Sequence, residues 1–253
     1  KHAKGEIVFF GEGDAVYSED YLDKAVRCLT ANPRMGGVCV VGAPWMVRST
    51  FATECINLEN EIQRSLLERG KLEPFYAWVL RKDAVLEAGR FDESLMQGED
   101  RDIFLRVKAL GYEIGLVPGI HWRHKRDEDL WMFAKKSYLR GKTRTLFLLK
   151  HRMITDLLRG LGLLWFLALT ILASLFFLPA IYLTLLGLVG ALACRLVKVV
   201  SVGWNIVQKR KYLLLLPFFS LTRHLSFGLG YTRGLTAVLH RKLTGRPLDW
   251  ASM

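Results

Sequence analysis

The first half of the chain alternates short apolar runs with longer segments that carry apolar residues at helical spacing. Apolar runs of a few residues bounded by glycine are typical of buried strands in an α/β sheet. Segments with one apolar face are typical of amphipathic helices. The predicted order is strand 6–10, helix 18–32, strand 37–42, helix 50–69, helix 100–110 and strand 112–117.

Local residues mark the ends of two of these helices. Ser18 is a candidate cap for the first helix, which must end before Pro33. Its predicted inner face consists of Leu22, Ala25, Val26 and Leu29. The helix near residue 100 is predicted to begin at Asp100 or Arg101 and to end with Gly111 at its C′ position.

The second half consists mainly of apolar helices. Residues 128–150 combine an apolar stripe with lysines and arginines on the other faces, which is the pattern of a helix in a membrane interface. The stripe consists of Leu130, Trp131, Phe133, Ala134, Tyr138 and Phe147. A solvated basic helix packed on the domain is the alternative. Arg159 and Arg195 then enclose 35 uncharged residues, too many for one span of about 20 residues and enough for two short ones. We therefore predict a helical hairpin over 158–178 and 180–202.

Basic residues flank the predicted hairpin on both sides, which places both of its ends in the cytoplasm. The segment 212–232 is also apolar, but Pro217, Arg223 and His224 interrupt it, so we predict an interfacial or re-entrant segment there. The predicted domains are an α/β domain over 1–126, an interfacial helix over 127–152 and a membrane region over 153–253, with its transmembrane hairpin at about 158–202.

Composition separates the same two halves. The 253 residues include 36 Lys and Arg against 24 Asp and Glu, and 51% are hydrophobic, which excludes a disordered chain. Residues 1–150 carry 24 basic and 22 acidic side chains, whereas residues 151–253 carry 12 and 2. The excess positive charge thus lies beside the apolar segments, where the positive-inside bias explains it, so a nucleic-acid partner is not expected.

The cysteines and the first residues complete the picture. Four cysteines without a C-x-x-C pair indicate neither a zinc site nor a disulfide framework, as fits a cytoplasmic domain. Residues 1–5 contain neither an initiator methionine nor an apolar leader, so we expect the chain to begin inside a domain.

An acidic turn follows the first predicted strand, in the segment Gly11-Glu12-Gly13-Asp14. We expect this strand to be parallel to its neighbours, and open α/β sheets bind ligands at the carboxyl ends of such strands. Two carboxylates two residues apart can converge on Mg²⁺ or Mn²⁺. An acidic turn without a ligand is the alternative.

Two further clusters are candidates for chemistry. Glu99 and Asp100 stand at a predicted helix N-terminus, where Asp100 can act as a general base or simply cap the helix. His121 and His124 follow the last predicted strand, and they are either metal ligands or ordinary surface histidines.

In this order, the clusters resemble a membrane-bound family 2 glycosyltransferase of the GT-A fold, over nearly the whole chain. Glu12-Gly13-Asp14 stands where that family has Asp-x-Asp. The other similar segments are residues 3–10, 18–22, 80–83, 89–92, 98–100, 105–106 and 111–112.

The resemblance implies a partial, Rossmann-like α/β domain of the GT-A fold followed by an α-helical membrane region. It implies that Asp100 is the catalytic base and that Glu99 supports it. Mg²⁺ or Mn²⁺ would be held by Glu12, Asp14 and His124, with His121 as the alternative histidine. Donor or acceptor binding is implied for Gly98, Arg101, His121 and Trp78.

The resemblance also implies an inverting reaction that moves a sugar from a nucleotide-sugar donor to a lipid-linked or surface glycan acceptor. The protein would be a multi-pass protein of the cell membrane with a cytoplasmic catalytic domain. Two or three strand–helix units expected from the family do not precede Lys1, so a truncated or degenerate, non-catalytic membrane relative is the alternative. The helix over 128–150 lacks the Gln-x-x-Arg-Trp pattern of processive synthases, so processive polymerisation is not expected.

Overall fold

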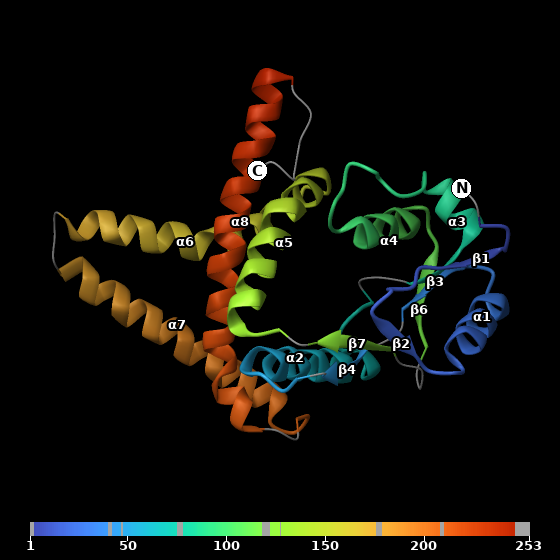
Figure 1. Ribbon diagram of the computed structural model, residues 1–253, viewed down its shortest axis with the longest axis horizontal. Helices are drawn as coiled ribbons and strands as arrows, with labels where there is room; N and C mark the ends of the chain where they lie inside the picture. The colour runs from blue at the N-terminus through green and yellow to red at the C-terminus, as the bar shows by residue number, and fades with distance from the viewer. Residues whose placement is uncertain are drawn as a thin grey trace. The chain divides into compact units, whose positions relative to one another are not determined.

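The computed structural model divides the chain into two compact units. The first comprises Lys1–Ser94 and Gly98–Asp127, and the second comprises Leu95–Gln97 and Glu128–Met253. Figure 1 shows the strands in the first unit and long helices in the second. The residues that the structure describes are 3–39, 42–46, 48–74, 78–117, 122–126, 128–175, 179–207 and 210–245.

The first unit is a mixed α/β domain with two small sheets, of the α/β class that the sequence predicts. Its elements are β1 (Ile7–Phe9), β2 (Ala15–Tyr17), α1 (Tyr21–Ala31), β3 (Met35–Cys39), β4 (Gly42–Met46), α2 (Phe51–Glu68), β5 (Val79–Arg81), α3 (Lys82–Glu87), α4 (Glu99–Ala109), β6 (Glu113–Leu116) and β7 (Trp122–Arg126). One sheet has the strand order β1-β5-β3-β6 and the other has the order β2-β7-β4.

Strand β1 forms where the sequence predicts it, but the prediction that it is parallel is wrong. It lies at the edge of its sheet and pairs antiparallel with β5, with Val8 opposite Leu80. In the described part of this sheet, β3 and β6 form the parallel pair. An apolar run indicates burial but not the direction of the neighbouring strand. The turn that carries Glu12 and Asp14 therefore follows an antiparallel edge strand.

Helix α1 packs against the first sheet through a face that confirms Ala25 and Leu29 of the prediction but not Leu22. Tyr21, Ala25 and Leu29 are buried, whereas Leu22 is 47% exposed. The N-cap is Asp20, not Ser18, and its carboxylate forms an ion pair with Lys24 at 2.6 Å. The helix begins two residues later than predicted, and Tyr21 rather than Leu22 contributes to its buried face.

Local hydrogen bonds fix the ends of two further elements. The Thr50 hydroxyl accepts a hydrogen bond from the main-chain N–H of Thr53, and the Thr50 N–H donates to the Thr53 hydroxyl, which forms a capping box at the start of α2. The Arg81 guanidinium donates to the Leu29 carbonyl near the end of α1 and, at 2.8 Å, to the Met35 carbonyl at the start of β3. Arg81 thereby joins three elements of the core.

The second unit is helical. Its elements are α5 (Leu130–Lys150), α6 (Ile154–Ser174), α7 (Pro179–Gly203), the 3₁₀ helix η1 (Arg210–Leu214) and α8 (Leu216–Thr244). Figure 1 shows α6 and α7 as a pair and α8 as a long helix that lies along α5. The bounds of α6 and α7 fall within four residues of the segments predicted for the hairpin.

Helix α8 covers most of the segment 212–232, for which the sequence predicts an interfacial or re-entrant placement. It continues without a break through Arg223 and His224. Pro217 lies in its first turn, where the missing N–H removes no intrahelical hydrogen bond. The placement of this segment in a membrane interface stays a prediction.

Small residues bring α5 and α8 close together. A Cβ atom added at Gly141 would lie 2.5 Å from the Phe227 carbonyl oxygen, and one added at Gly230 would overlap the Tyr138 carbonyl oxygen. Within the apolar stripe predicted for α5, Phe133 is buried whereas Trp131 is 77% exposed. The helices therefore meet through these glycines and also through Phe133, whose ring stacks on that of Phe219 of α8 with centroids 4.1 Å apart.

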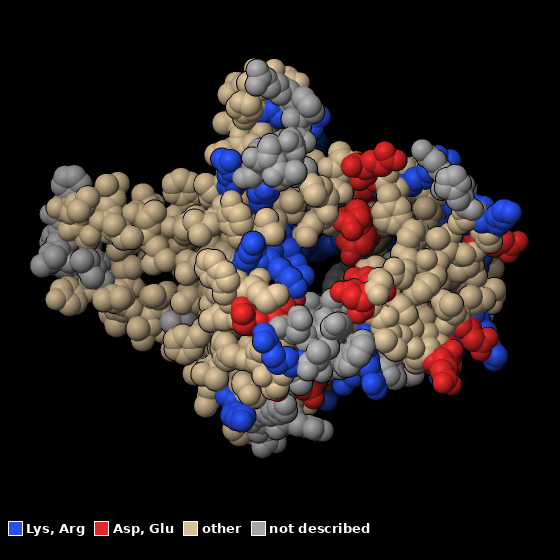
Figure 2. All heavy atoms as spheres, viewed as in Figure 1, with Lys and Arg blue, Asp and Glu red and all other residues tan. Residues whose placement is uncertain are grey.

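One helix of the second unit has the length and composition of a membrane span when the described residues are searched. This helix is α6, and 17% of its most apolar window is buried. Figure 2 shows that, on the face in view, the described residues of the outer part of the α6–α7 pair are uncharged. A single such helix does not establish a multi-pass protein.

Candidate functional site

The turn with Glu12 and Asp14 connects β1 to β2 and is held by two hydrogen bonds. The Ala15 N–H donates to the Glu12 carbonyl at 3.3 Å, and the Glu12 N–H donates to the Tyr17 hydroxyl at 2.7 Å. Glu12 is half-buried and Asp14 is exposed. The two carboxylates thus stand on a short, closed turn at the edge of the domain.

The second sheet brings His124 next to this turn. In the antiparallel pairing of β2 with β7, Ala15 lies opposite His124 and Tyr17 lies opposite Trp122. Asp14 directly precedes Ala15, so the main chains of Asp14 and His124 are neighbours although 110 positions separate them in the sequence. The side chain of His124 and all of His121 lie outside the described part of the structure.

Trp78 connects the two sheets at this end of the domain. Its main-chain carbonyl accepts a hydrogen bond from the Phe10 N–H at 2.8 Å, and its indole lies 6.1 Å from the Trp122 ring, centroid to centroid. Phe10 in turn contacts Phe91 with ring centroids 4.8 Å apart. Trp78 therefore lies between the end of β1 and the strand that carries His124, as a support for the turn.

The second carboxylate cluster forms the first turn of α4. The helix begins at Glu99, one or two residues before the predicted start, and its N-cap is Gly98 with φ of 84°. This left-handed conformation favours glycine. One Asp100 carboxylate oxygen accepts a hydrogen bond from the Arg101 N–H at 2.7 Å. Asp100 is therefore not the N-cap, but its carboxylate does bind a main-chain N–H of the first turn.

Glu99 and Asp100 influence each other. Burial raises the pKa of Glu99 above its ordinary value, and the neighbouring negative charge of Asp100 raises it further. Glu99 therefore keeps its proton to a higher pH than a solvated glutamate. A carboxyl group with a raised pKa beside a second carboxylate is an arrangement that proton-transfer sites use.

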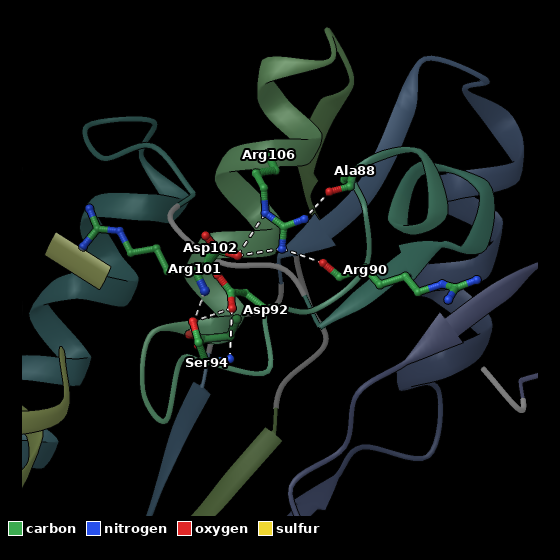
Figure 3. Close-up of polar contacts among 8 residues, drawn as sticks. Ala88, Arg90, Asp92, Ser94, Arg101, Asp102 and Arg106 are labelled. Atoms are coloured by element: carbon green, nitrogen blue, oxygen red, sulfur yellow. Dashed lines mark hydrogen bonds and ion pairs between the residues drawn. The ribbon is translucent and has the colours of Figure 1, made fainter. Parts of the chain in front are cut away.

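Arg106 on α4 fixes the loop that leads into this helix (Figure 3). Its guanidinium binds the buried Asp102 carboxylate at 2.6 Å and donates to the main-chain carbonyls of Ala88 and Arg90. In the same loop, the Asp92 carboxylate accepts hydrogen bonds from the N–H and the hydroxyl of Ser94. Charge-assisted hydrogen bonds thus hold the loop that precedes Gly98.

The predicted site residues form two separate groups in the described structure. Among the described side chains, no three of the His, Cys, Asp and Glu residues come together as a group that could hold a metal ion. Glu12 and Asp14 lie on one turn, and Glu99, Asp100 and Arg101 lie on α4. The third proposed ligand, His124, is placed by its main chain alone.

Two supporting residues are not evident from the sequence. Tyr17 binds the Glu12 main chain, and Arg106 stands out in the sequence only as part of a motif. The available signal for Tyr17 is its position in an apolar run three residues after Asp14. For Arg106, the signal is its i,i+4 spacing from Asp102 on one helix.

Comparison with known families identifies the class of protein. The family model described as glycosyl transferase family group 2 matches residues 7–198. The chain therefore belongs to the family 2 glycosyltransferases, and transfer of a sugar is its general chemistry. A comparison with curated proteins finds no match.

Proposed function

We propose that the protein is a metal-dependent, inverting glycosyltransferase that moves a sugar from a nucleotide-sugar donor to a membrane-associated acceptor, either lipid-linked or a surface glycan. The observation that carries this proposal is the pairing of β2 with β7, which brings His124 beside the turn with Glu12 and Asp14. This is the combination of groups expected for a metal and a diphosphate in a family whose members commonly use divalent cations.

The donor set fits Mg²⁺ or Mn²⁺. Such ions bind through one or two carboxylates, and substrate phosphates supply further oxygen ligands. Glu12 and Asp14 lie two positions apart on one turn that is closed by the hydrogen bond between the Ala15 N–H and the Glu12 carbonyl. When bound, the metal would neutralise charge on the departing diphosphate.

Asp100 is proposed to take the proton of the acceptor hydroxyl as that oxygen attacks the anomeric carbon in a single displacement. The Arg101 N–H holds one of its carboxylate oxygens, which limits the orientations of the group. Glu99 adjoins it and tunes the local charge. Gly98, Arg101, Trp78 and His121 are proposed to bind donor or acceptor.

The donor class is tested by isothermal titration of the detergent-solubilised chain with UDP-, GDP- and dTDP-sugars in the presence of Mn²⁺. We expect one nucleotide class to bind and this binding to be lost in Asp14→Ala. Binding that persists unchanged in Asp14→Ala would remove the metal site from the proposal. Absence of binding for every donor would favour the alternative of a non-catalytic membrane relative.

The membrane part of the proposal rests on the second unit. Along α6, Leu169 and Ile171 are 61% and 68% exposed, and α7 likewise exposes large apolar residues. An apolar surface of this extent favours burial in lipid. We propose that α6 and α7 insert as a hairpin with both ends on the cytoplasmic side, in a multi-pass protein of the cell membrane whose catalytic domain faces the cytoplasm.

A further inference from the structure

Tyr17 contacts the main chain of the turn that carries Glu12 and Asp14. Its hydroxyl oxygen accepts a hydrogen bond from the Glu12 N–H at 2.7 Å. With the bond between the Ala15 N–H and the Glu12 carbonyl, this contact fixes both main-chain polar groups of Glu12. These two bonds fix the main-chain conformation at Glu12, and with it the direction in which its side chain leaves the turn.

The Tyr17 ring is itself held in place. Its centroid lies 4.9 Å from the ring of Phe9 and 4.9 Å from the ring of Tyr21, with edge-to-face geometry in both pairs. Tyr21 is 1% exposed, so this cluster belongs to the core. The strand pairing of Tyr17 with Trp122 fixes the main chain as well. The Tyr17 hydroxyl therefore contacts the turn from a ring that is held in place by the core.

The turn also lies directly on these rings. A Cβ atom added at Gly11 would come within 2.9 Å of the Phe9 ring and 3.6 Å of the Tyr17 hydroxyl oxygen. Glycine at position 11 thus allows the chain to pass close over the aromatic cluster.

The Tyr17 hydroxyl keeps its own hydrogen. A phenol that accepts a hydrogen bond from an N–H can still donate one. Within the described residues, the structure gives this hydrogen no acceptor.

We propose that Tyr17 is a positioning residue of the glycosyltransferase site, which holds the Glu12 main chain so that the carboxylates of Glu12 and Asp14 face one divalent cation. This inference rests on the metal site proposed above. Replacement of Tyr17 by phenylalanine keeps the ring and removes the acceptor of the Glu12 N–H. The turn then samples orientations in which the carboxylates do not bind together.

The test is binding of Mn²⁺ to the full chain in detergent, with free Mn²⁺ followed by electron paramagnetic resonance. We expect Tyr17→Phe to weaken Mn²⁺ binding about three- to tenfold at unchanged stoichiometry, the range that corresponds to one net hydrogen bond. Tyr21→Phe is the matched control because it removes a hydroxyl from the same aromatic cluster and leaves the Glu12 bond intact. Asp14→Ala should abolish binding.

The outcomes separate the two claims. Wild-type affinity in Tyr17→Phe, together with lost binding in Asp14→Ala, would overturn the positioning role and leave the metal site in place. Equal weakening in Tyr17→Phe and Tyr21→Phe would also overturn it, because general loosening of the aromatic core would then explain the effect. Binding that survives Asp14→Ala would contradict the proposed metal site and, with it, the role of Tyr17.

Discussion

At the scale of single residues, Arg106 has the densest set of polar contacts near α4. One guanidinium binds the Asp102 carboxylate and two main-chain carbonyls of the preceding loop. Asp102 is fully buried, so its charge is offset by Arg106 rather than by water. This arrangement holds the preceding loop against α4, whose first turn carries Glu99 and Asp100.

Arg106→Met tests this role through stability. The substitution leaves the buried Asp102 carboxylate without its counter-charge, and we expect a loss of about 3 kcal/mol in the free energy of unfolding. Arg27→Met is the control, because Arg27 forms a similarly spaced pair with Asp23 at an exposed position. Urea denaturation of both variants provides the comparison, and equal losses would contradict the special role of Arg106.

Glu99 predicts a pH dependence. Because its pKa is raised in the folded protein, the folded state binds this proton more tightly than the unfolded state does. The stability of the folded state therefore falls with rising pH. The contribution of Glu99 to this stability is present below the ordinary glutamate pKa and is lost as the pH rises through the raised value. Thermal melts between pH 4 and 7 should fall more with rising pH for wild type than for Glu99→Gln. Parallel profiles would contradict the assignment.

Some residues of the candidate site could be predicted from the sequence and others could not. Glu12, Asp14, Glu99 and Asp100 stand out because acidic residues beside glycines are visible in the sequence. Tyr17 does not, because its role depends on a hydrogen bond across a turn whose shape the sequence does not specify. Supporting residues of this kind become recognisable only when the main chain is placed.

At the scale of elements, the packing of α5 on α8 depends on the absence of side chains. A Cβ atom added at Gly230 would lie 2.7 Å from the Lys142 main-chain nitrogen and would overlap the Tyr138 carbonyl oxygen. Gly162 on α6, in contrast, has nothing within 4 Å of such an atom. The two glycines therefore provide a matched pair in neighbouring helices.

Gly230→Ala should destabilise the protein by about 2–3 kcal/mol, because the added methyl group forces the helices apart. Gly162→Ala should be neutral or stabilise the protein by up to about 1 kcal/mol, because alanine favours the helix and meets open space. Melting temperatures of the two variants in the same detergent test this. A melting temperature unchanged by Gly230→Ala would contradict the close contact between α5 and α8.

The elements also show which parts of the fold the sequence predicts. Helices α2 and α5 are predictable because their apolar and polar residues recur over many turns. The second sheet is not, since its strands have three to five residues and β2 pairs with a segment more than 100 positions away. Short strands of this kind depend on partners that local periodicity does not reveal.

At the scale of the whole molecule, the chain consists of two regions that differ in composition. The first 150 residues are nearly balanced in charge, and the remaining residues carry 12 basic and 2 acidic side chains. The long apolar segments are therefore visible from composition, and α6 and α7 follow them closely. The chain thus joins an α/β unit of nearly balanced charge to a helical unit that is apolar and basic.

Insertion of α6 is tested by thiol accessibility. In a Cys194→Ser background, Leu169→Cys should resist a membrane-impermeant maleimide in native membranes and react after detergent is added, because lipid covers this exposed apolar position. Lys135→Cys on the exposed basic face of α5 should react in both conditions. Rapid labelling of Leu169→Cys in intact membranes would contradict the insertion of α6.

The central claim, that Asp100 accepts the proton in sugar transfer, is tested most directly by comparing Asp100→Asn with wild type in one assay. Donor binding and release of the nucleoside diphosphate are measured on the full chain in membranes, with the donor class identified by titration. We expect Asp100→Asn to bind donor as tightly as wild type and to lose turnover by about 100-fold or more, the usual contribution of a general base. Unchanged turnover in Asp100→Asn would contradict the account.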